Sequence, residues 1–326
     1  MAAAVLAVAV AGCGGGSATS SNAAAHRAAT AAARRRAAAP APLHLVYRSL
    51  YSLSAPLRDP AYAALGGGRF AMLGGLTAAD TSSAGIEVAD TRRVLATAAL
   101  PVAQHDAQAA TLGGKVYVFG GGSLTELDHI LGYDPARGAV AQIGALATPR
   151  SDVAVAALGG TAYVVGGYDG SAWLNTIVAY RPGSVPRTVG RLPVGLRYAA
   201  VAAAGRYLLV IGGSTPSAPS TGIYRFDPRT GAVARIGRLP APITHGEAAT
   251  LGSFVYLVGG RGDLLTSQTS RVWSIDPLTG RVRSAGRLPR PTSDAAVVAI
   301  GGGLVVAGGL SGSDTLSGVG ELVPAG

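Results

Sequence analysis

The stretch Lys115-Val116-Tyr117-Val118-Phe119-Gly120-Gly121 decides the fold, because a short apolar run that ends in two glycines recurs along the chain. Runs of β-branched and aromatic residues bounded by glycine are typical of buried strands. The glycine pairs begin at Gly74, Gly120, Gly166, Gly212, Gly259 and Gly308, at intervals of 46, 46, 46, 47 and 49 residues. A period of this length is typical of a β-propeller with one four-stranded blade per repeat. The sequence therefore predicts an all-β fold with six blades.

Each repeat carries the turn signals that a four-stranded antiparallel blade needs. The apolar run Val153–Leu158 is joined to the next strand by Gly159-Gly160, which predicts a hairpin. A third strand ends at Tyr133-Asp134-Pro135, and Gly138 follows; proline presets φ and glycine supplies a positive φ in such turns. A fourth strand ends at Leu-Pro, as in Leu192-Pro193.

The last repeat contains three strands, and a segment near the N-terminus supplies the fourth. Residues 46–56 resemble the fourth strands of the other repeats, for example residues 187–193. We therefore expect the N-terminal strand to close the last blade, which removes sheet edges that would otherwise be open. The predicted propeller covers residues 43–326.

The repeats resemble those of the Kelch family. The resemblance rests on the glycine pair after an apolar strand with tyrosine, on Tyr133-Asp134-Pro135 and on Pro149-Arg150, and it covers roughly residues 44–326. It implies a six-bladed Kelch-type propeller with four antiparallel strands per blade. Kelch blades usually carry a tryptophan in the fourth strand, whereas this chain has Val140, Val233 and Val282 there.

The N-terminal region resembles the signal peptide of a bacterial lipoprotein. Residues 2–12 are apolar but too few to span a membrane, and Val10-Ala11-Gly12-Cys13 resembles a lipobox, in which the cysteine is lipidated. We expect residues 1–13 to be the signal peptide with its lipobox Cys13, and residues 14–42 to be an Ala/Gly/Ser-rich linker. The resemblance implies an extracytoplasmic protein attached to the cell membrane by lipid. The alternative is that Cys13 stands there by chance.

A polar set is predicted at one mouth of the central channel. Counting back fourteen residues from each glycine pair gives Pro60, Asp106, Asp152, Tyr198, His245 and Asp294, and the neighbouring positions add further polar residues. Concave polar mouths are common ligand sites. The candidate ligand-binding residues are Arg58, His105, Asp106, Arg150, Asp152, Arg197, Tyr198, His245 and Asp294. The alternative is that Asp and Ser are turn formers at the start of the first strands.

Glu247 is the candidate catalytic residue. It falls in a first strand at a position that is mostly alanine in the other repeats, and a buried acid needs a partner. A raised pKa would suit a general acid or base. The alternative, which we expect, is that Glu247 pairs with Arg197 or another arginine between blades. The histidines are scattered, so no metal site and no cofactor are predicted.

Two classes of function remain open. The first is a cell-envelope lipoprotein whose propeller binds a glycan or an envelope protein at the channel mouth; the second is a carbohydrate mutarotase or epimerase, resembling the six-bladed periplasmic sialic acid mutarotases. Both would bring Arg197, His245 and Glu247 into one pocket. Copper chemistry like that of galactose oxidase is excluded, because it needs a cysteine that residues 44–326 lack. The net charge of +10 comes without a basic stripe interleaved with aromatic residues, so nucleic acid is not an expected partner, and we expect a monomer.

Overall fold

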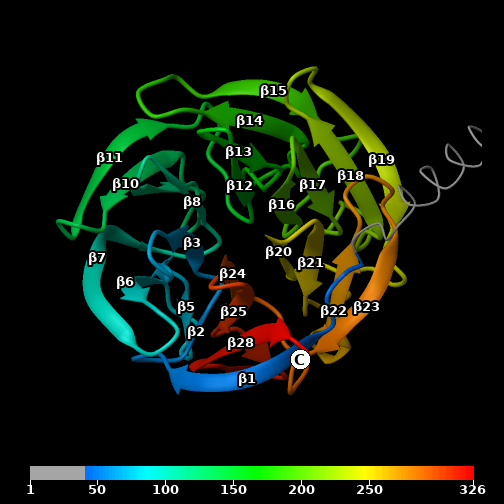
Figure 1. Cartoon of the computed structure of the whole chain (residues 1–326). Coiled ribbons are helices and arrows are strands. Elements are labelled where there is room, and N and C mark those ends of the chain that lie inside the picture. The colour runs from blue at the N-terminus through cyan, green and yellow to red at the C-terminus, as the bar shows by residue number, and fades with distance from the viewer. Residues whose placement is uncertain (1–40) are drawn as a thin grey trace, which may run out of the picture. The chain divides into compact units, whose positions relative to one another are not determined.

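The computed structural model describes residues 41–326, which form six antiparallel blades around a central channel (Figure 1). The predicted signal peptide, Cys13 and nearly all of the predicted linker lie outside these residues. The described part contains no helix of the length and hydropathy needed to cross a membrane. The predictions of an all-β six-bladed propeller and of four strands per blade are confirmed.

The blades follow one another along the chain, each running from an inner to an outer strand. Blade 1 consists of β3 (Ala61–Leu65), β4 (Arg69–Leu73), β6 (Ser83–Ala89) and β7 (Val94–Gln104). Blade 2 consists of β8 (Gln108–Leu112), β9 (Lys115–Phe119), β10 (His129–Asp134) and β11 (Ala139–Ala145). Blade 3 consists of β12 (Ala154–Leu158), β13 (Thr161–Val165), β14 (Thr176–Tyr180) and β15 (Arg187–Arg191).

The second half repeats this order. Blade 4 consists of β16 (Ala200–Ala204), β17 (Tyr207–Ile211), β18 (Gly222–Asp227) and β19 (Ala232–Arg238). Blade 5 consists of β20 (Glu247–Leu251), β21 (Phe254–Val258), β22 (Arg271–Ile275) and β23 (Val282–Arg287). Blade 6 consists of β24 (Ala296–Ile300), β25 (Gly303–Ala307), β28 (Gly318–Pro324) and β1 (Leu45–Ser52). Short elements lie in the loops: β2 (Leu57–Arg58), β5 (Leu76–Thr77), β26 (Leu310–Ser311), β27 (Asp314–Thr315) and the 3-10 helix η1 (Leu265–Ser267).

The N-terminal strand closes the ring, as predicted. β1 pairs with β28 over seven residue pairs from Leu45–Pro324 to Ser52–Gly318, and Leu45 also bridges to Gly286 of β23 in blade 5. Both ends of the described chain therefore lie at the end of the blades where the first-to-second and third-to-fourth strand turns are. We call this end the turn face. The opposite end, formed by the second-to-third strand loops and the connections between blades, is the mouth.

The glycine pairs join each blade to the next, which explains why they recur. The second glycine of each pair donates a backbone hydrogen bond of 2.8–2.9 Å to a carbonyl of the following connection, for example Gly213 N–H to Ile243 O. A Cβ on the first glycine, such as Gly212, would overlap that same carbonyl oxygen, and its φ of +65° already disfavours other residues. The repeat therefore reflects a backbone contact that only glycine permits.

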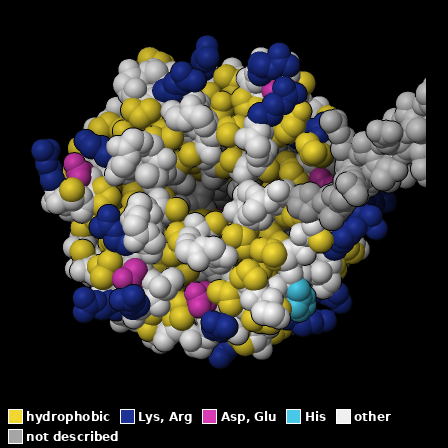
Figure 2. All heavy atoms as spheres, viewed as in Figure 1, with side chains coloured by type: hydrophobic (Ala, Val, Ile, Leu, Met, Phe, Trp, Pro, Cys, Tyr) yellow, Lys and Arg dark blue, Asp and Glu magenta, His cyan; other side chains and the backbone are white. Residues whose placement is uncertain are grey.

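The hydrophobic core lies between adjacent blades. Phe119 of blade 2, for example, packs edge-on against Tyr180 of blade 3, with ring centroids 5.5 Å apart. Val140 and Val233, where Kelch blades usually carry tryptophan, are partly buried against these clusters. The inner strands leave an apolar vestibule of about 370 Å³, lined mostly by alanine, valine and threonine, toward the turn face. Figure 2 looks into a central hollow bordered by hydrophobic side chains, with Lys and Arg side chains around the rim.

Candidate functional site

Six residues with left-handed backbone conformation, one from each blade, form a ring at the mouth. They have φ between +50° and +60° and are Asp59, Asp106, Asp152, Tyr198, His245 and Asp294. Blade 1 therefore contributes Asp59, whereas the sequence count placed Pro60 there. The count was wrong by one residue because the turn of three glycines, Gly66–Gly68, is one residue longer than Gly113-Gly114 in blade 2.

Backbone hydrogen bonds link these residues from blade to blade. Asp152 N–H donates to Asp106 O, Tyr198 to Asp152, His245 to Tyr198, Asp294 to His245 and Asp59 to Asp294, at 2.9–3.2 Å. Tyrosine and histidine rarely adopt a positive φ, and such strained residues persist where the surrounding structure fixes them. The ring therefore holds six side chains around the channel in fixed orientations.

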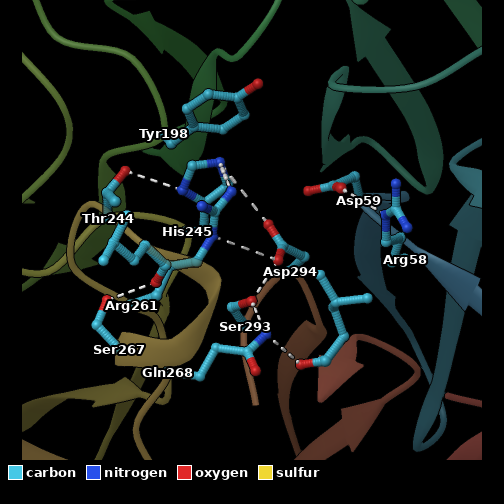
Figure 3. Close-up of polar contacts among 12 residues, drawn as sticks. Arg58, Asp59, Tyr198, Thr244, His245, Arg261, Ser267, Gln268, Ser293 and Asp294 are labelled. Carbon is cyan, nitrogen blue, oxygen red and sulfur yellow. Dashed lines mark hydrogen bonds and ion pairs between the residues drawn. The ribbon is translucent and has the colours of Figure 1, made fainter. Parts of the chain in front are cut away.

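The ring side chains enclose a small polar cavity of about 40 Å³, which is enough for a few water molecules. His245 stacks on Tyr198, with ring centroids 3.7 Å apart. On its other side His245 contacts Arg261, whose Nη2 lies 2.9 Å from Nε2 (Figure 3). Asp294 accepts a hydrogen bond from Ser293 and lies 3.9 Å from His245 Nε2. These contacts make one connected polar network across blades 4, 5 and 6.

Burial controls the protonation of this network. It raises the pKa of the Asp59, Asp106 and Asp294 carboxyls, and neighbouring carboxylates raise the first two further. Burial lowers the pKa of His245, and the adjacent Arg261 lowers it further. The imidazole is therefore neutral near pH 7, and the cavity carries less charge than its formal composition suggests.

Arg197 sits on an aromatic shelf at the outer edge of the cavity. Its guanidinium lies 4.4 Å from the ring centroid of Tyr168 and 5.3 Å from that of Trp173, and its Nε donates to Asp152. A guanidinium that stacks on aromatic rings keeps some of its N–H donors available for a ligand. Tyr168 also lies edge-to-face with Trp173, at 5.2 Å. Blade 3 thus supplies the shelf, and blade 4 supplies the cation.

Arg58 of blade 1 lies across the mouth from Arg197 of blade 4, whereas His105 belongs to blade 2, next to blade 3. Arg58 Nη2 is 2.5 Å from Asp80 Oδ1 and its Nε is 3.7 Å from Asp59. His105 Nδ1 lies 2.9 Å from Ser82 Oγ, and its Nε2 is 3.6 Å from Asp106. Both side chains are partly exposed, so they border the cavity opening.

Arg150 does not belong to the mouth, although the sequence placed it among the candidates. Its side chain is 3% exposed, and its Nη1 donates to Gly166 O and to Thr176 Oγ1. Its own carbonyl accepts the hydrogen bond from Gly121. Burial lowers the pKa of Arg150 to about 10. The side chain therefore supports the joint between blades 2 and 3.

Glu247 pairs with a tyrosine, and the expected arginine partner was wrong. Tyr62 reaches across the channel from blade 1, and its hydroxyl donates to Glu247 Oε2 at 2.5 Å. Gln108 supports this arrangement by accepting from Tyr62 N–H. The three side chains separate the polar cavity from the apolar vestibule. Burial raises the pKa of Glu247 to about 8, against the opposing effect of the Tyr62 hydrogen bond.

Glu247 and His245 line the same cavity, but Arg197 does not line it and reaches it through Asp152. The structure thus connects the three residues without bringing them into one pocket. The sequence missed Tyr62, Tyr168 and Trp173 as members of the site. A usable signal is the residue after each glycine pair, because it pairs with a mouth residue: Tyr168 bridges to Ser151, as Arg261 does to Thr244.

Buried polar atoms without partners gather at the mouth. Within residues 41–326, half of the buried side-chain nitrogen and oxygen atoms that lack a hydrogen-bond partner lie there: Asp152 Oδ1, Asp294 Oδ1, Trp173 Nε1 and Arg261 Nε. Such groups are rare in native proteins and call for a ligand or water. The same residues contain no group of three or more His, Cys, Asp or Glu side chains arranged to hold a metal ion.

Comparisons with known proteins agree with this fold. The Kelch motif matches residues 149–184 and 195–240. No curated protein matches the sequence. The solved structure of YjhT superposes with a TM-score of 0.73 at 16% identity, covering 83% of this chain and 95% of YjhT. At this identity the likeness concerns the fold. The two Kelch motifs and the six four-stranded blades support a Kelch-repeat β-propeller family for this chain.

Proposed function

We propose that this protein is a cell-envelope lipoprotein whose propeller binds a glycan at its mouth. The observation that carries the proposal is the set of unpaired buried atoms, which includes two acceptors (Asp152 Oδ1, Asp294 Oδ1) and two donors (Trp173 Nε1, Arg261 Nε). Because these atoms are buried, a ligand over the mouth would reach them through water molecules; water and hydroxyl groups both donate and accept, so a hydrated polyhydroxyl ligand suits such a mixed set. A ligand of a single charge would satisfy only part of it.

The shape of the site supports binding over the mouth. The cavity of about 40 Å³ holds water molecules, so a sugar ring would lie above it, against the partly exposed Arg197 and its aromatic shelf. Aromatic side chains at the site offer an apolar surface and a polar edge to a sugar ring. Arg58 lies across the opening and would contact the far side of the same ligand, and the partly exposed His105 borders the opening beside blade 3.

A glycan array with the full chain, followed by calorimetry on the best ligand, tests the proposal. Arg197→Ala should weaken binding by about 1–3 kcal/mol, the cost of removing a charged hydrogen-bond partner. Arg191→Ala is the matched control, because Arg191 is exposed on the outer strand of blade 3 and should leave affinity unchanged. If no glycan binds, or if both variants bind equally, the glycan proposal fails. A protein ligand captured by the mouth would then replace it.

A sugar mutarotase is the second candidate, because Glu247 and Tyr62 form a buried acid–phenol pair next to His245. Mutarotation needs one group to take the proton of the anomeric hydroxyl and another to protonate the ring oxygen. Glu247, with its pKa near 8, would serve either role near neutral pH. Anomer exchange measured by NMR tests this. Exchange that Glu247→Gln abolishes while ligand binding persists supports the enzyme; no exchange above the uncatalysed rate rejects it.

The membrane attachment is a separate part of the proposal. It rests on Val10-Ala11-Gly12-Cys13, which the described residues do not include. Cys13→Ser should prevent lipidation, so the protein should appear unprocessed or in the medium. Metabolic labelling with a fatty acid is the direct measurement. A Cys13→Ser variant that still incorporates label would refute the role of this cysteine.

A further inference from the structure

The turn face carries an excess of positive charge. Exposed cations occur in the turns of blades 1 to 5: Arg69, Arg92, Arg93, Lys115, Arg137, Arg181, Arg187, Arg206, Arg229 and Arg281. The acids of the same turns are Asp90, Asp134, Asp227 and Asp276, and each accepts backbone hydrogen bonds that cap its own turn. Lys115 and Arg206 are paired with Asp134 and Asp227, at 3.8 and 3.3 Å. The other cations outnumber the remaining acids.

Two of these arginines border a pocket of about 410 Å³ between blades 3 and 4. Arg181 donates from its Nε to Thr161 Oγ1 at 2.8 Å, and Arg187 also lines the pocket. Within residues 41–326 neither guanidinium has a carboxylate within ion-pair distance. Ser184 and Pro228 complete the wall. Two unpaired guanidinium groups facing one pocket are suited to a phosphate group.

Large apolar side chains project from the same face. Val185 is 86% exposed at the edge of this pocket, and Leu278 is 66% exposed at the tip of the third-to-fourth strand turn of blade 5. Leu43, also exposed, lies where the described chain begins. Figure 2 shows Lys and Arg side chains around the rim of one face, with hydrophobic side chains between them and at the centre. Basic side chains are attracted to anionic lipid headgroups, and exposed apolar side chains gain by burial at the membrane boundary.

The point where the chain enters the propeller favours a membrane as the partner, and this step rests on the proposed lipid anchor at Cys13. Residues 1–40 precede the described part, and the chain enters the propeller at the turn face, where Ala325 N–H bonds to His44 O. We infer that the turn face is a docking surface for an anionic phospholipid bilayer, with the Arg181–Arg187 pocket receiving a headgroup phosphate. The contact is non-covalent and does not depend on the ligand of the mouth. It orients the mouth away from the bilayer.

Vesicle co-sedimentation of the full chain carrying Cys13→Ser tests this inference, because that variant removes any contribution of lipidation. The protein should bind vesicles of one-third phosphatidylglycerol and two-thirds phosphatidylcholine, and should not bind pure phosphatidylcholine. Binding should be lost on raising salt from about 0.1 M to about 1 M, which shortens the Debye length from about 10 Å to about 3 Å. Equal binding to both vesicle types would overturn the inference.

Matched variants locate the contact. Arg181→Glu with Arg187→Glu should weaken binding at least about tenfold, since each basic residue near an anionic surface contributes substantially. Arg191→Glu with Arg238→Glu changes the charge equally on the outer strands and should have a much smaller effect. Val185→Ser should also weaken binding, whereas Leu124→Ser, fully exposed on a mouth loop, should not. Equal effects of the paired variants would show that the turn face is not the surface that contacts the bilayer.

Discussion

Replacing the first glycine of a pair tests whether these pairs join the blades. Gly212→Ala places a Cβ against the Ile243 carbonyl oxygen, a backbone atom of the following connection. Gly205→Ala is the matched control in the same blade, because Gly205 has nearly the same φ, +59° against +65°, but no atom lies within 4 Å of its added Cβ. The two variants share the backbone cost and differ only in the contact.

The expected magnitudes follow from this difference. A left-handed conformation costs alanine about 1–2 kcal/mol relative to glycine, so Gly205→Ala should lose about that much stability. Gly212→Ala must in addition displace the Ile243 carbonyl and break its hydrogen bond from Gly213, which measures 2.8 Å. Leaving these two buried groups unpaired costs about 1–3 kcal/mol each, so the total loss should be about 3–8 kcal/mol.

Urea unfolding monitored by circular dichroism measures both losses. Gly212→Ala should shift the midpoint at least twice as far as Gly205→Ala, with a similar slope. Equal shifts would mean that the glycine pairs serve only local turn geometry, and the account of the repeat given above would be refuted.

Three further outcomes are expected. Glu247 has a pKa of about 8 in the folded protein against an ordinary value of 4.5, so its contribution to stability falls as pH rises between these values. Glu247→Gln should therefore raise the melting temperature more at pH 8 than at pH 5. A difference in melting temperature that does not change with pH would contradict the burial of this carboxyl. Leu45→Ala should cost about 2–4 kcal/mol of unfolding free energy, because Leu45 is buried in the closing strand β1. Val46→Ala should cost less than about 0.5 kcal/mol, because Val46 is exposed on the same strand. Similar losses in the two variants would argue against closure of the ring by β1. Arg150→Ala should lower the melting temperature without changing the affinity for the proposed glycan ligand. A loss of affinity without a loss of stability would mean that Arg150 contacts the ligand at the mouth.

We could predict the number of blades, their strand content and the closure of the ring, because backbone geometry restricts which residues can occupy the repeated positions. A carbonyl that approaches Gly212 from the next blade excludes every side chain, so glycine recurs at that point. Closure was predictable because strand count and edge protection demand a partner for β28.

The site was predictable only in part, because its contacts cross the channel. The Tyr62–Glu247 hydrogen bond joins residues 185 positions apart in the chain, and no local pattern indicates it. Arg150 is adjacent to mouth residues in the sequence, but its side chain points between blades 2 and 3, where its guanidinium donates hydrogen bonds to Gly166 O and Thr176 Oγ1. A single extra residue in the Gly66–Gly68 turn moved Asp59 into the position assigned to Pro60.

The antiparallel pairing of β1 with β28 has a mechanical consequence. A pull on the chain just before Leu45, with the rest of the propeller held in place, acts along the length of β1, whereas the hydrogen bonds to β28 run across it. The seven residue pairs are therefore loaded together in shear and do not open one after another. A protein tethered at this end can bear tension through the strand that completes its ring, and the last blade acts as the point where that tension enters the fold.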